Sequence, residues 1–286
     1  MRYGKLYEEG VKRLKAAHIA EAETDCFILF SECFGLSRAT YFFKKEEEIP
    51  AGDADKIELY FDWLKRREAR EPVQYIIGNQ EFCGLKFRVT PDVLIPRLDT
   101  EVLVDEVLKR EPGAASVLDL CSGSGCILIS LMKLGSFKYG VGTDISEAAL
   151  RIAGENAKEN GVNAELLQGD LFEALNELSD GKCKFDVIVS NPPYIAEREK
   201  PELADEVLLH EPSMALFAEH NGLIFYERIL ADANKYLAPH GTIYFEIGCS
   251  QAEDIKRICQ ENGFMDVEVI KDLAGLDRIV RARVTS

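Results

Sequence analysis

The stretch Phe185-Asp-Val-Ile-Val-Ser190-Asn191-Pro192-Pro193-Tyr194 joins a run of mostly β-branched apolar residues to a polar tetrapeptide. The apolar run predicts a strand that is buried on both faces, as in a parallel sheet. Asn191 then stands at the carboxyl end of that strand, which is where open α/β sheets bind their ligands. The stretch therefore predicts an α/β fold with a site at this edge of the sheet.

The tetrapeptide Asn191–Tyr194 carries hydrogen-bond groups that suit a planar amino group. Asn191 has one carbonyl acceptor and two amide donors, and the prolines leave carbonyl groups with no competing N–H. A substrate –NH2 can give its hydrogens to the Asn191 oxygen and to a backbone carbonyl, while the Tyr194 ring lies against its plane. The alternative is an Asn-Pro turn that only ends the strand.

The composition is that of an ordinary soluble globular protein. The chain has 286 residues, of which 47% are hydrophobic and 29% are charged, enough for two domains or for one α/β domain with an appendage. No apolar run follows a basic segment at the N-terminus, and no apolar stretch approaches membrane length. We therefore expect a cytoplasmic protein without a membrane partner.

The cysteines do not form a recognisable metal-binding or disulfide pattern. None belongs to a Cys-x-x-Cys pair, several lie in apolar periodic segments, and the chain has only four histidines. We interpret them as reduced, small hydrophobic residues and predict no metal. They are Cys26, Cys33, Cys83, Cys121, Cys126, Cys183, Cys249 and Cys259.

The net charge of −16 argues against a phosphate backbone as partner. The densest basic cluster, Lys65-Arg66-Arg67 with Arg70, stands among acidic residues, and we expect it to be a solvated helix face. No nucleic-acid partner is expected.

The first 76 residues have apolar residues at helical spacings, which predicts a small helical bundle. Gly35 is expected to end the second helix, Ser37 to cap a short third helix through Tyr41 to Phe43, and Asp53 to cap a longer fourth helix. Trp63 is expected to serve packing. The predicted inner faces are Leu6, Val11 and Leu14; Cys26, Phe27, Leu29, Phe30, Cys33 and Phe34; and Ile57, Tyr60, Phe61 and Leu64.

Two short elements follow this bundle. Residues 81–90 read as a hairpin that turns near Gly84, and Asp99 or Thr100 can cap a helix that begins close to them. Arg97 directly precedes that helix, and the sequence leaves open whether it anchors the loop or belongs to the site.

From Ser116 onward strands and helices alternate, which predicts a doubly wound, mostly parallel sheet. The fourth strand contains the opening stretch, and the C-terminus is predicted to be a closing antiparallel pair. Ser146 is expected to cap the second helix of this region and Gly161 to end it. The other predicted elements are strands 117–120, 139–143, 164–168 and 242–247, helices 127–134, 223–237 and 251–262, a Pro239-His-Gly241 turn, and the pair 267–270 with 278–284.

A glycine turn between the first strand and the first helix suggests a nucleoside-type ligand. The turn Cys121-Ser122-Gly123-Ser124-Gly125 can bind a ligand through backbone amides at the helix N-terminus, although it also fits a packing turn. Asp144 ends the next strand, where a carboxylate can accept hydrogen bonds from both ribose hydroxyls. The dinucleotide spacing Gly-x-Gly-x-x-Gly is absent, which argues against NAD and flavin.

The glycine turn after Asp119, Asp144 and Asn191–Tyr194 together resemble the class I S-adenosylmethionine-dependent methyltransferases that act on planar amino groups. More narrowly, the chain resembles the HemK/PrmC family of peptide chain release factor glutamine methyltransferases. The resemblance runs nearly end to end. It includes Glu71-Pro-Val-Gln-Tyr75, Ile95-Pro-Arg97-Leu-Asp99-Thr-Glu101, Glu211-Pro212, Glu246-Ile-Gly248 and Asp272-Leu-Ala-Gly-Leu-Asp277-Arg278.

This resemblance implies a Rossmann-like methyltransferase domain over residues 97–286, a β-hairpin linker over 77–96, and a helical domain over 1–76 that helps to bind the substrate. It implies that the methyl acceptor is the glutamine amide in the Gly-Gly-Gln motif of class 1 release factors. S-adenosylmethionine would be bound by Cys121, Ser122, Gly123, Ser124, Gly125, Asp144, Leu171 and Asn191, and the glutamine by Asn191, Pro192, Pro193 and Tyr194, with Arg97 as a further candidate.

Two residues depart from the family's usual pattern. Cys121 stands where the turn commonly has its first glycine, so its backbone angle must be compatible with a Cβ atom. Leu171 stands where the family often has an aromatic residue, so a stacking contact with adenine would be lost.

The catalytic hypothesis is that Asn191 and the Pro192 carbonyl hold both amide hydrogens, with Tyr194 beside them, and align the nitrogen with the methyl group. Such positioning can supply roughly 7–11 kcal/mol, so no separate general base is needed. Two alternatives stay open: an adenine methyltransferase acting on DNA or RNA, which would have to flip a base, and a non-catalytic module that binds S-adenosylmethionine. We expect a monomer.

Overall fold

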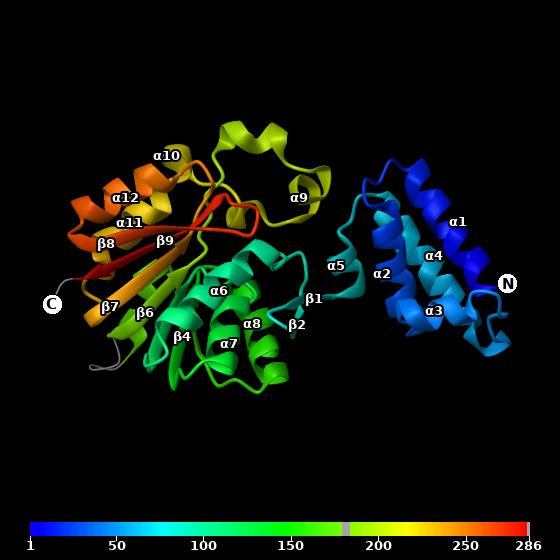
Figure 1. Cartoon of the computed structure of the whole chain (residues 1–286), viewed down its shortest axis with the longest axis horizontal. Coiled ribbons are helices and arrows are strands. Elements are labelled where there is room, and N and C mark those ends of the chain that lie inside the picture. The colour runs from blue at the N-terminus through cyan, green and yellow to red at the C-terminus, as the bar shows by residue number, and fades with distance from the viewer. Residues whose placement is uncertain (179–183, 285–286) are drawn as a thin grey trace. The chain divides into compact units, whose positions relative to one another are not determined.

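The computed structural model describes residues 1–178 and 184–284, and Cys183 lies outside them. The chain folds into two compact units. The helical unit consists of Met1–Gly78 together with a separate stretch, Ala204–His210. The second unit, called the catalytic unit here because the family resemblance predicts the active site in it, contains Asn79–Leu203, apart from the residues not described, and the described residues from Glu211 onward (Figure 1).

The helical unit is built on the apolar faces that the sequence predicted. Leu6, Leu14, Phe30, Tyr60 and Leu64 are fully buried in one cluster. Its second helix ends at Gly35 in the left-handed region, and the Ser37 hydroxyl accepts from Thr40 N at 3.1 Å, as predicted. The elements are α1 Tyr3–Ala16, α2 Ala22–Phe34, α3 Arg38–Lys44, the 3-10 turn Ala51–Asp53, α4 Ala54–Glu68, α5 Val73–Ile77 and α9 Asp205–His210.

Two predictions for α4 are wrong. Asp53 occupies the position before the helix, but its side chain makes no capping bond, because residues 51–53 already form a 3-10 turn and its carboxylate pairs with Lys56 at 3.1 Å. Arg67 is not on a solvated face: it is 5% exposed, and its guanidinium contacts Asp25 Oδ2 at 2.8 Å and Glu206 Oε1 at 3.1 Å. These ion pairs tie α9 to the rest of the helical unit.

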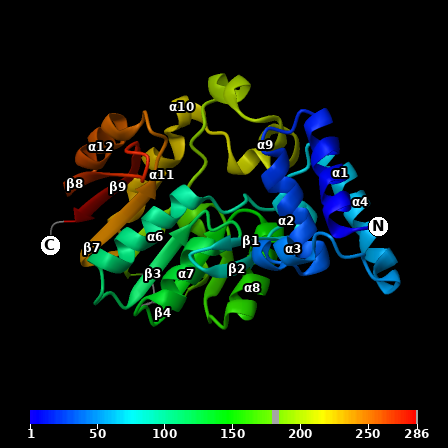
Figure 2. The same cartoon turned by 45° about the vertical axis from the view of Figure 1, so that its right-hand side comes forward.

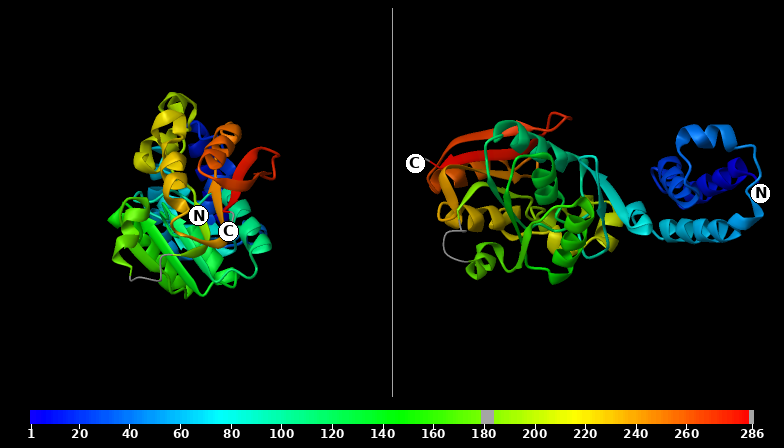
Figure 3. Two further views of the ribbon diagram at one scale, coloured as in Figure 1. Left: turned by 90° about the vertical axis from the view of Figure 1, so that its left-hand side faces the viewer. Right: turned by 90° about the horizontal axis from the view of Figure 1, so that it is seen from below.

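The catalytic unit contains a seven-stranded sheet in the order β5-β4-β3-β6-β7-β9-β8. The first five strands in this order are parallel to one another. β9 runs antiparallel to both of its neighbours, β7 and β8. This confirms the predicted mostly parallel sheet with a closing antiparallel pair. Figures 1 and 3 show the β8–β9 hairpin at the edge of the sheet. The strands are β3 Ser116–Leu120, β4 Tyr139–Asp144, β5 Glu165–Gln168, β6 Phe185–Ser190, β7 Leu237–Glu246, β8 Phe264–Lys271 and β9 Asp277–Val284.

Helices cover both faces of this sheet, so the unit has three layers. α6 Leu98–Arg110, α7 Cys126–Leu134 and α8 Glu147–Asn160 lie on one face, and α11 Ile224–Ala233 and α12 Ala252–Glu261 on the other (Figures 1 and 2). Shorter elements are α10 Glu219–Gly222 and the 3-10 turns Leu171–Glu177, Glu197–Glu202 and Ser213–Ala215. Within the described ranges, no helix has both the length and the apolar character that crossing a membrane requires.

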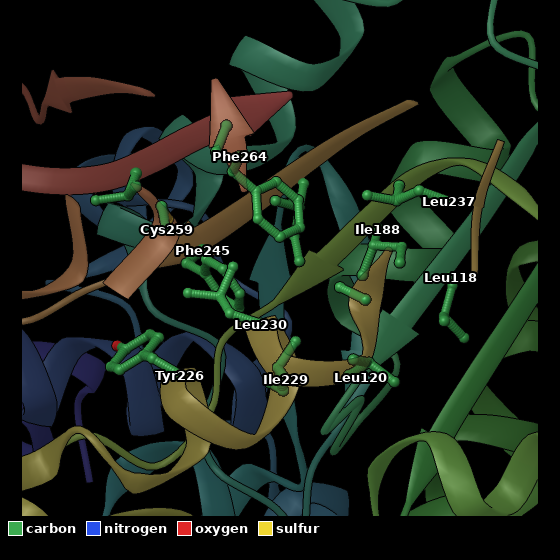
Figure 4. Packing of buried hydrophobic residues seen from close by; sticks show 14 of the residues in the cluster. Leu118, Leu120, Ile188, Tyr226, Ile229, Leu230, Leu237, Phe245, Cys259 and Phe264 are labelled. Carbon is green, nitrogen blue, oxygen red and sulfur yellow. The ribbon is translucent and has the colours of Figure 1, made fainter. Parts of the chain in front are cut away.

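Alternate residues of the strands enter the two layers of core, because successive side chains of a strand point to opposite faces. Val187 and Val189 of β6 belong to the cluster under α6 and α7, whereas Ile188 packs under α11 and α12. Figure 4 shows part of the latter cluster around Ile188, Tyr226 and Phe245. Burial on both faces is what the apolar run before Asn191 predicted.

The predicted hairpin is present as β1 Asn79–Phe82 and β2 Leu85–Arg88. It turns through Cys83 and Gly84, both of which have positive φ angles. Phe82 and Phe87 are fully buried in the core under α6 and α7. The hairpin therefore packs as part of the catalytic unit.

Two boundaries in the catalytic unit differ from prediction. Arg97 precedes α6, and neither Asp99 nor Thr100 caps it, since both already lie inside the helix that begins at Leu98. Helix α11 ends at Ala233, whereas the sequence predicted that it would continue to Leu237. Residues 239–241, which were predicted to form a turn, belong to β7. The pairing of β7 with β6 shifts register there, between Phe185 and Val187 of β6. This bulge accommodates the residues that suggested a turn.

The remaining predicted caps are present. The Ser146 hydroxyl accepts from Ala149 N at 3.2 Å, and Gly161 ends α8 with φ of 66°.

Candidate active site

A cavity of about 360 Å³ lies in the catalytic unit where β3, β4 and β6 end. This volume falls within the range of small-molecule sites. Its wall includes most of the residues predicted for the site: Arg97, Cys121, Ser122, Gly123, Ser124, Asp144, Leu171, Asn191 and Pro193. Gly125, Pro192 and Tyr194 do not line it in this structure, although each adjoins a residue that does.

The glycine turn wraps the N-terminus of α7. Gly123 and Gly125 have φ angles of 55° and 79°, in the left-handed region that favours glycine. A Cβ atom on Gly125 would lie 2.9 Å from Ile129 Cδ1 and 3.1 Å from Ala153 Cβ. Gly125 therefore allows α7 and α8 to pack closely, while the preceding residues face the cavity.

Asp144 is held in place by backbone amides. Its Oδ2 accepts from Gly123 N at 2.8 Å and its Oδ1 from Ser146 N at 2.9 Å. Burial raises the pKa of this carboxyl group, and the backbone hydrogen bonds oppose that shift. Each oxygen keeps a lone pair, so the group can still accept hydrogen bonds from a ligand's hydroxyls.

Both residues that depart from the usual pattern have left-handed backbones. Cys121 has φ of 62° and Leu171 has φ of 53°, which is uncommon for residues with a Cβ atom. The Leu171 side chain is 7% exposed and packs in the core under α11 and α12. Two aromatic residues, Phe217 and Phe225, line the cavity in addition; they come from the segments after β6, where the sequence showed no pattern that would single them out.

The tetrapeptide lies at the cavity's edge, with its polar groups in contact with distant elements. Asn191 Nδ2 donates to Thr100 Oγ1 of α6 at 3.4 Å. The Tyr194 hydroxyl donates to Oε1 of Glu246, the last residue of β7, at 3.3 Å. Burial raises the pKa of the Tyr194 phenol. Thr100 and Glu246 were not predicted as site residues.

The backbone of the tetrapeptide is also held from behind. Gln251 Nε2 donates to the Tyr194 carbonyl at 3.0 Å, while Gln251 Oε1 accepts from Gly248 N at 2.9 Å. Gly222 approaches the same carbonyl so closely that a Cβ atom would lie 2.1 Å from it. These contacts leave little room for the segment to shift.

Arg97 lies in the wall of the cavity and is anchored there. Its Nη2 donates to Glu211 Oε1 at 2.6 Å, and Glu211 Oε2 accepts from Ile95 N at 3.2 Å. The Glu211 side chain is 1% exposed. Arg97 thus anchors the loop before α6, which is one of the two roles that the sequence left open. The other role, a direct contact of Arg97 with substrate, stays a prediction.

The cavity wall is poor in groups that act as bases near neutral pH. Among the described residues that line it there is no histidine or lysine, and burial raises the pKa of the Cys121 thiol. Asp170 is paired with Arg228 at 2.7 Å. The arrangement can bind a nucleoside beside a planar amino group and orient both, which is the chemistry of group transfer by positioning.

Comparison with known proteins agrees with this chemistry. Residues 113–279 match the family described as a methyltransferase domain, and residues 5–78 match the PrmC N-terminal domain. The fold and the site thus define a methyltransferase of the S-adenosylmethionine-dependent class.

The curated relatives narrow this class. Release factor glutamine methyltransferase of Geobacter sulfurreducens is 41% identical, with 98% of this chain and 93% of that protein aligned. The enzyme of the same name from Cereibacter sphaeroides is 39% identical over 99% of both chains. The chain belongs to the family of release factor glutamine methyltransferases.

Solved structures with less similar sequences share the fold alone. A methyltransferase from Pyrococcus furiosus aligns with a TM-score of 0.56 at 18% identity, covering 78% of this chain and all of that one. The 16S rRNA N2 G1207 methyltransferase of Thermus thermophilus aligns with a TM-score of 0.52 at 19% identity, covering 72% of this chain and 49% of that one.

Proposed function

We propose that this protein transfers the methyl group of S-adenosylmethionine to the side-chain amide nitrogen of the glutamine in the Gly-Gly-Gln motif of class 1 peptide chain release factors. The observation that carries the proposal is the position of Asn191 at the end of β6, in the wall of the cavity that Asp144 and the glycine turn also line. Membership of the release factor glutamine methyltransferase family supports the choice of a protein amide over a nucleobase.

The residues around the cavity fit S-adenosylmethionine. Asp144 has unused lone pairs for ribose hydroxyls, the glycine turn leaves space without Cβ atoms at Gly123, and apolar side chains such as Phe225 and Leu171 lie in the same wall. These residues, with Cys121, Ser122, Ser124 and Asn191, would hold the cofactor, and Gly125 would support them through α7 packing. When bound, S-adenosylmethionine supplies an electrophilic methyl group on a sulfonium centre.

The protein's own part in the reaction is to orient the acceptor. An amide nitrogen is a poor nucleophile because its lone pair is delocalised into the carbonyl group. The Asn191 Oδ1 atom and the Pro192 carbonyl would accept the two amide hydrogens and so favour charge developing on nitrogen. The Tyr194 ring and Pro193 would flank the amide plane, and the anchored Arg97 would fix the loop beside it. Alignment of this kind removes the need for a general base before the N–C bond forms. The methylated nitrogen then releases one of its two hydrogens as a proton to water.

We further propose that the helical unit contributes to release factor binding and that residues 77–96, which include the hairpin, form the linker between the helical domain and the methyltransferase domain. The match of residues 5–78 to the PrmC N-terminal domain supports a specialised role for this part of the chain. The net charge of −16 supports a protein partner over nucleic acid. A monomeric state, the cytoplasmic location and the absence of a metal stay predictions.

Methyl transfer from labelled S-adenosylmethionine tests the proposed function. The purified protein is incubated with a class 1 release factor, with the same factor carrying alanine for the Gly-Gly-Gln glutamine, and with double-stranded DNA. We expect label on the first substrate only. Equal labelling of the alanine variant, or label on DNA, would show that the acceptor has been assigned wrongly.

A further inference from the structure

Three exposed leucines stand on two segments of the catalytic unit. Leu273 is 100% exposed, Leu98 is 71% exposed and Leu276 is 48% exposed. Neither core cluster of the described catalytic unit includes any of them. Leu98 is the first residue of α6, and the other two lie in the turn between β8 and β9. Single exposed leucines are ordinary on protein surfaces, so the position of these three relative to the site decides whether they matter.

The β8–β9 turn lies at the same edge of the sheet as Asn191. Ser190, the last residue of β6, pairs with Phe245 of β7, and the next residue of β7, Glu246, pairs with Ile279 of β9. Because β9 is antiparallel to β7, the residues before Ile279 run past this edge, in the direction that Asn191 takes from β6. Figure 3 shows the tip of the β8–β9 hairpin projecting beyond the sheet.

Arg278 joins this turn to the start of α6. Its Nη2 atom lies 3.1 Å from Asp272 Oδ2 and 3.3 Å from Asp99 Oδ2. Asp99 follows Leu98 directly, and Arg97, which precedes Leu98, lines the cavity. The two segments that carry the exposed leucines therefore meet beside the cavity wall.

The turn holds its two leucines on a fixed backbone. Asp272 Oδ1 accepts from Ala274 N and from Leu276 N, both at 2.9 Å, and Asp272 N donates to the Leu276 carbonyl at 2.8 Å. Gly275, with φ of 83°, donates its N–H to the Asp272 carbonyl at 3.0 Å. A polar residue at position 273 would serve such a turn equally well. An ordered turn also loses less conformational entropy when another surface covers it.

The charged groups beside the leucines already have partners. Arg278 faces Asp99 and Asp272, and Arg97 faces Glu211. The side chains of Asp272 and Glu211 are 2% and 1% exposed, so both carboxylates are desolvated in the folded chain. The two segments thus offer apolar area while both arginines are neutralised, which suits an uncharged protein surface and not a phosphate backbone.

We propose that Leu98, Leu273 and Leu276 form a docking surface for the release factor, which covers them with an uncharged, apolar surface beside its Gly-Gly-Gln loop. This inference rests on the proposed function and deepens it, because it assigns part of substrate binding to the catalytic unit. A glutamine in a folded protein brings the surface around it to the cavity, and the leucines stand where that surface arrives. Covering them contributes to binding without contact with the reacting atoms.

The double substitution Leu273→Ser/Leu276→Ser tests the docking surface. Both positions are exposed, and their backbone hydrogen bonds are kept, so the fold should be unchanged. Calorimetry with a class 1 release factor and saturating S-adenosylhomocysteine should give a Kd about 10- to 100-fold above that of wild type. The affinity for S-adenosylhomocysteine and kcat at saturating release factor should keep their wild-type values. Leu98→Ser, on the other segment, should raise the Kd by about 3- to 10-fold.

Met265→Ser/Leu134→Ser is the matched control. Met265 is 54% exposed and Leu134 is 49% exposed. Met265 lies near the start of β8, at the other end of the hairpin from the turn, and Leu134 is the last residue of α7, whose first turn faces the cavity. This variant removes similar apolar side chains away from the cavity and should bind the release factor with the wild-type Kd.

Three outcomes would overturn the docking surface. One is a wild-type Kd in both Leu98→Ser and Leu273→Ser/Leu276→Ser. Another is an equal rise of the Kd in the control variant. The third is a wild-type dimer in sedimentation that the leucine substitutions dissociate, because it would assign the leucines to a second copy of the chain.

Binding needs no methyl transfer, so it separates this inference from the proposed function. If the wild-type protein labels no release factor glutamine, the proposed function fails, and the Kd values still test the docking surface. If it labels the glutamine and the leucine variants bind as tightly as wild type, only the docking surface fails.

Discussion

The Arg97 guanidinium lies 2.6 Å from the Glu211 carboxylate and joins the loop before α6 to a segment more than a hundred residues later in the chain. Glu211 is almost completely buried, whereas about a third of the Arg97 side chain is exposed. The pair therefore combines a desolvated anion with a partly hydrated cation. Arg97 itself lies in the wall of the cavity that the proposed function assigns to S-adenosylmethionine and the glutamine.

This pair should act as a unit in stability. Arg97→Ala leaves Glu211 buried without its cation, and a double-mutant cycle with Glu211→Gln should give a coupling of about 1–3 kcal/mol in the free energy of unfolding, reduced from the fully buried case by solvent. Urea titration measures it. The exposed Arg257–Glu261 pair of α12 is the control, and the same cycle there should give a coupling free energy below about 0.5 kcal/mol. Equal coupling in both pairs would contradict the anchor.

Asn191→Ala should remove methyl transfer while sparing the cofactor site. Loss of a positioned hydrogen-bonding group at the reacting centre lowers kcat by about 100-fold or more. Calorimetric titration with S-adenosylhomocysteine should show an affinity within a few fold of wild type, since the glycine turn and Asp144 are unchanged. Near-normal turnover by this variant would refute the role of Asn191.

Gly222→Ala should displace the tetrapeptide from behind. The added Cβ atom would lie 2.1 Å from the Tyr194 carbonyl, and the glycine has φ of 87°. Overpacking and backbone strain together should cost about 2–4 kcal/mol in unfolding free energy and lower kcat. Gly113→Ala is the control, because no atom lies within 4 Å of its added Cβ. Similar losses in both variants would show that the effect is not local.

Cys121→Gly should be tolerated at the cofactor site. A left-handed backbone costs a residue with a Cβ atom about 1–2 kcal/mol, which glycine avoids, and this gain offsets the lost contacts of the partly buried thiol. We expect the free energy of unfolding to stay within about 1 kcal/mol of wild type and the affinity for S-adenosylhomocysteine to be at least as high. Cys126→Gly, at the first residue of α7, removes a buried side chain with no left-handed strain to relieve and should be clearly destabilising. A weaker cofactor affinity in Cys121→Gly would mean that the thiol itself contributes to binding.

Asp119 should make the protein less stable as the pH rises. The side chain is fully buried, neither oxygen has a hydrogen-bond partner in the described chain, and burial raises its pKa from 3.8 to about 8. Between these pH values the unfolded chain has lost the proton that the folded protein retains. The contribution of Asp119 to the free energy of unfolding is therefore fully present below pH 4 and is lost as the pH rises towards 8.

The substitution Asp119→Asn removes this contribution. The free energy of unfolding of wild type minus that of Asp119→Asn should therefore fall between pH 5 and pH 9, by about 1.4 kcal/mol for each pKa unit titrated in that interval. Urea titrations of both proteins at the two pH values measure the difference. A difference that does not change with pH would mean that the carboxyl group is solvated in the folded protein.

The sequence predicted most helices and strands, because their apolar residues recur with clear periods and their caps are local. Ser37, Ser146, Gly35 and Gly161 end or begin helices within a few residues of themselves, so no distant contact was needed to identify them. Predictions failed where a local signal competed with tertiary structure. Arg67 belongs to a basic run, but its partners Asp25 and Glu206 come from other helices and bury it.

The site was predictable only where its residues sit in recognisable local patterns. The glycine turn and Asn191–Tyr194 each follow directly after a strand, and Asp144 is the last residue of one. Thr100 and Glu246 lie in segments that the family resemblance includes, but their hydrogen bonds to Asn191 and Tyr194 come from α6 and β7, which meet only in the folded sheet.

The helical unit is made from two separate stretches of chain, Met1–Gly78 and α9. A chain truncated to begin at residue 79 would therefore not be the catalytic unit alone: it would still carry α9, whose Glu206 would have lost its ion-pair partner Arg67. The chain returns from α9 at His210, one peptide bond before the Glu211 that anchors Arg97. To express the catalytic unit by itself, residues 1–78 must be removed and the α9 segment, residues 204–210, must be replaced by a short loop.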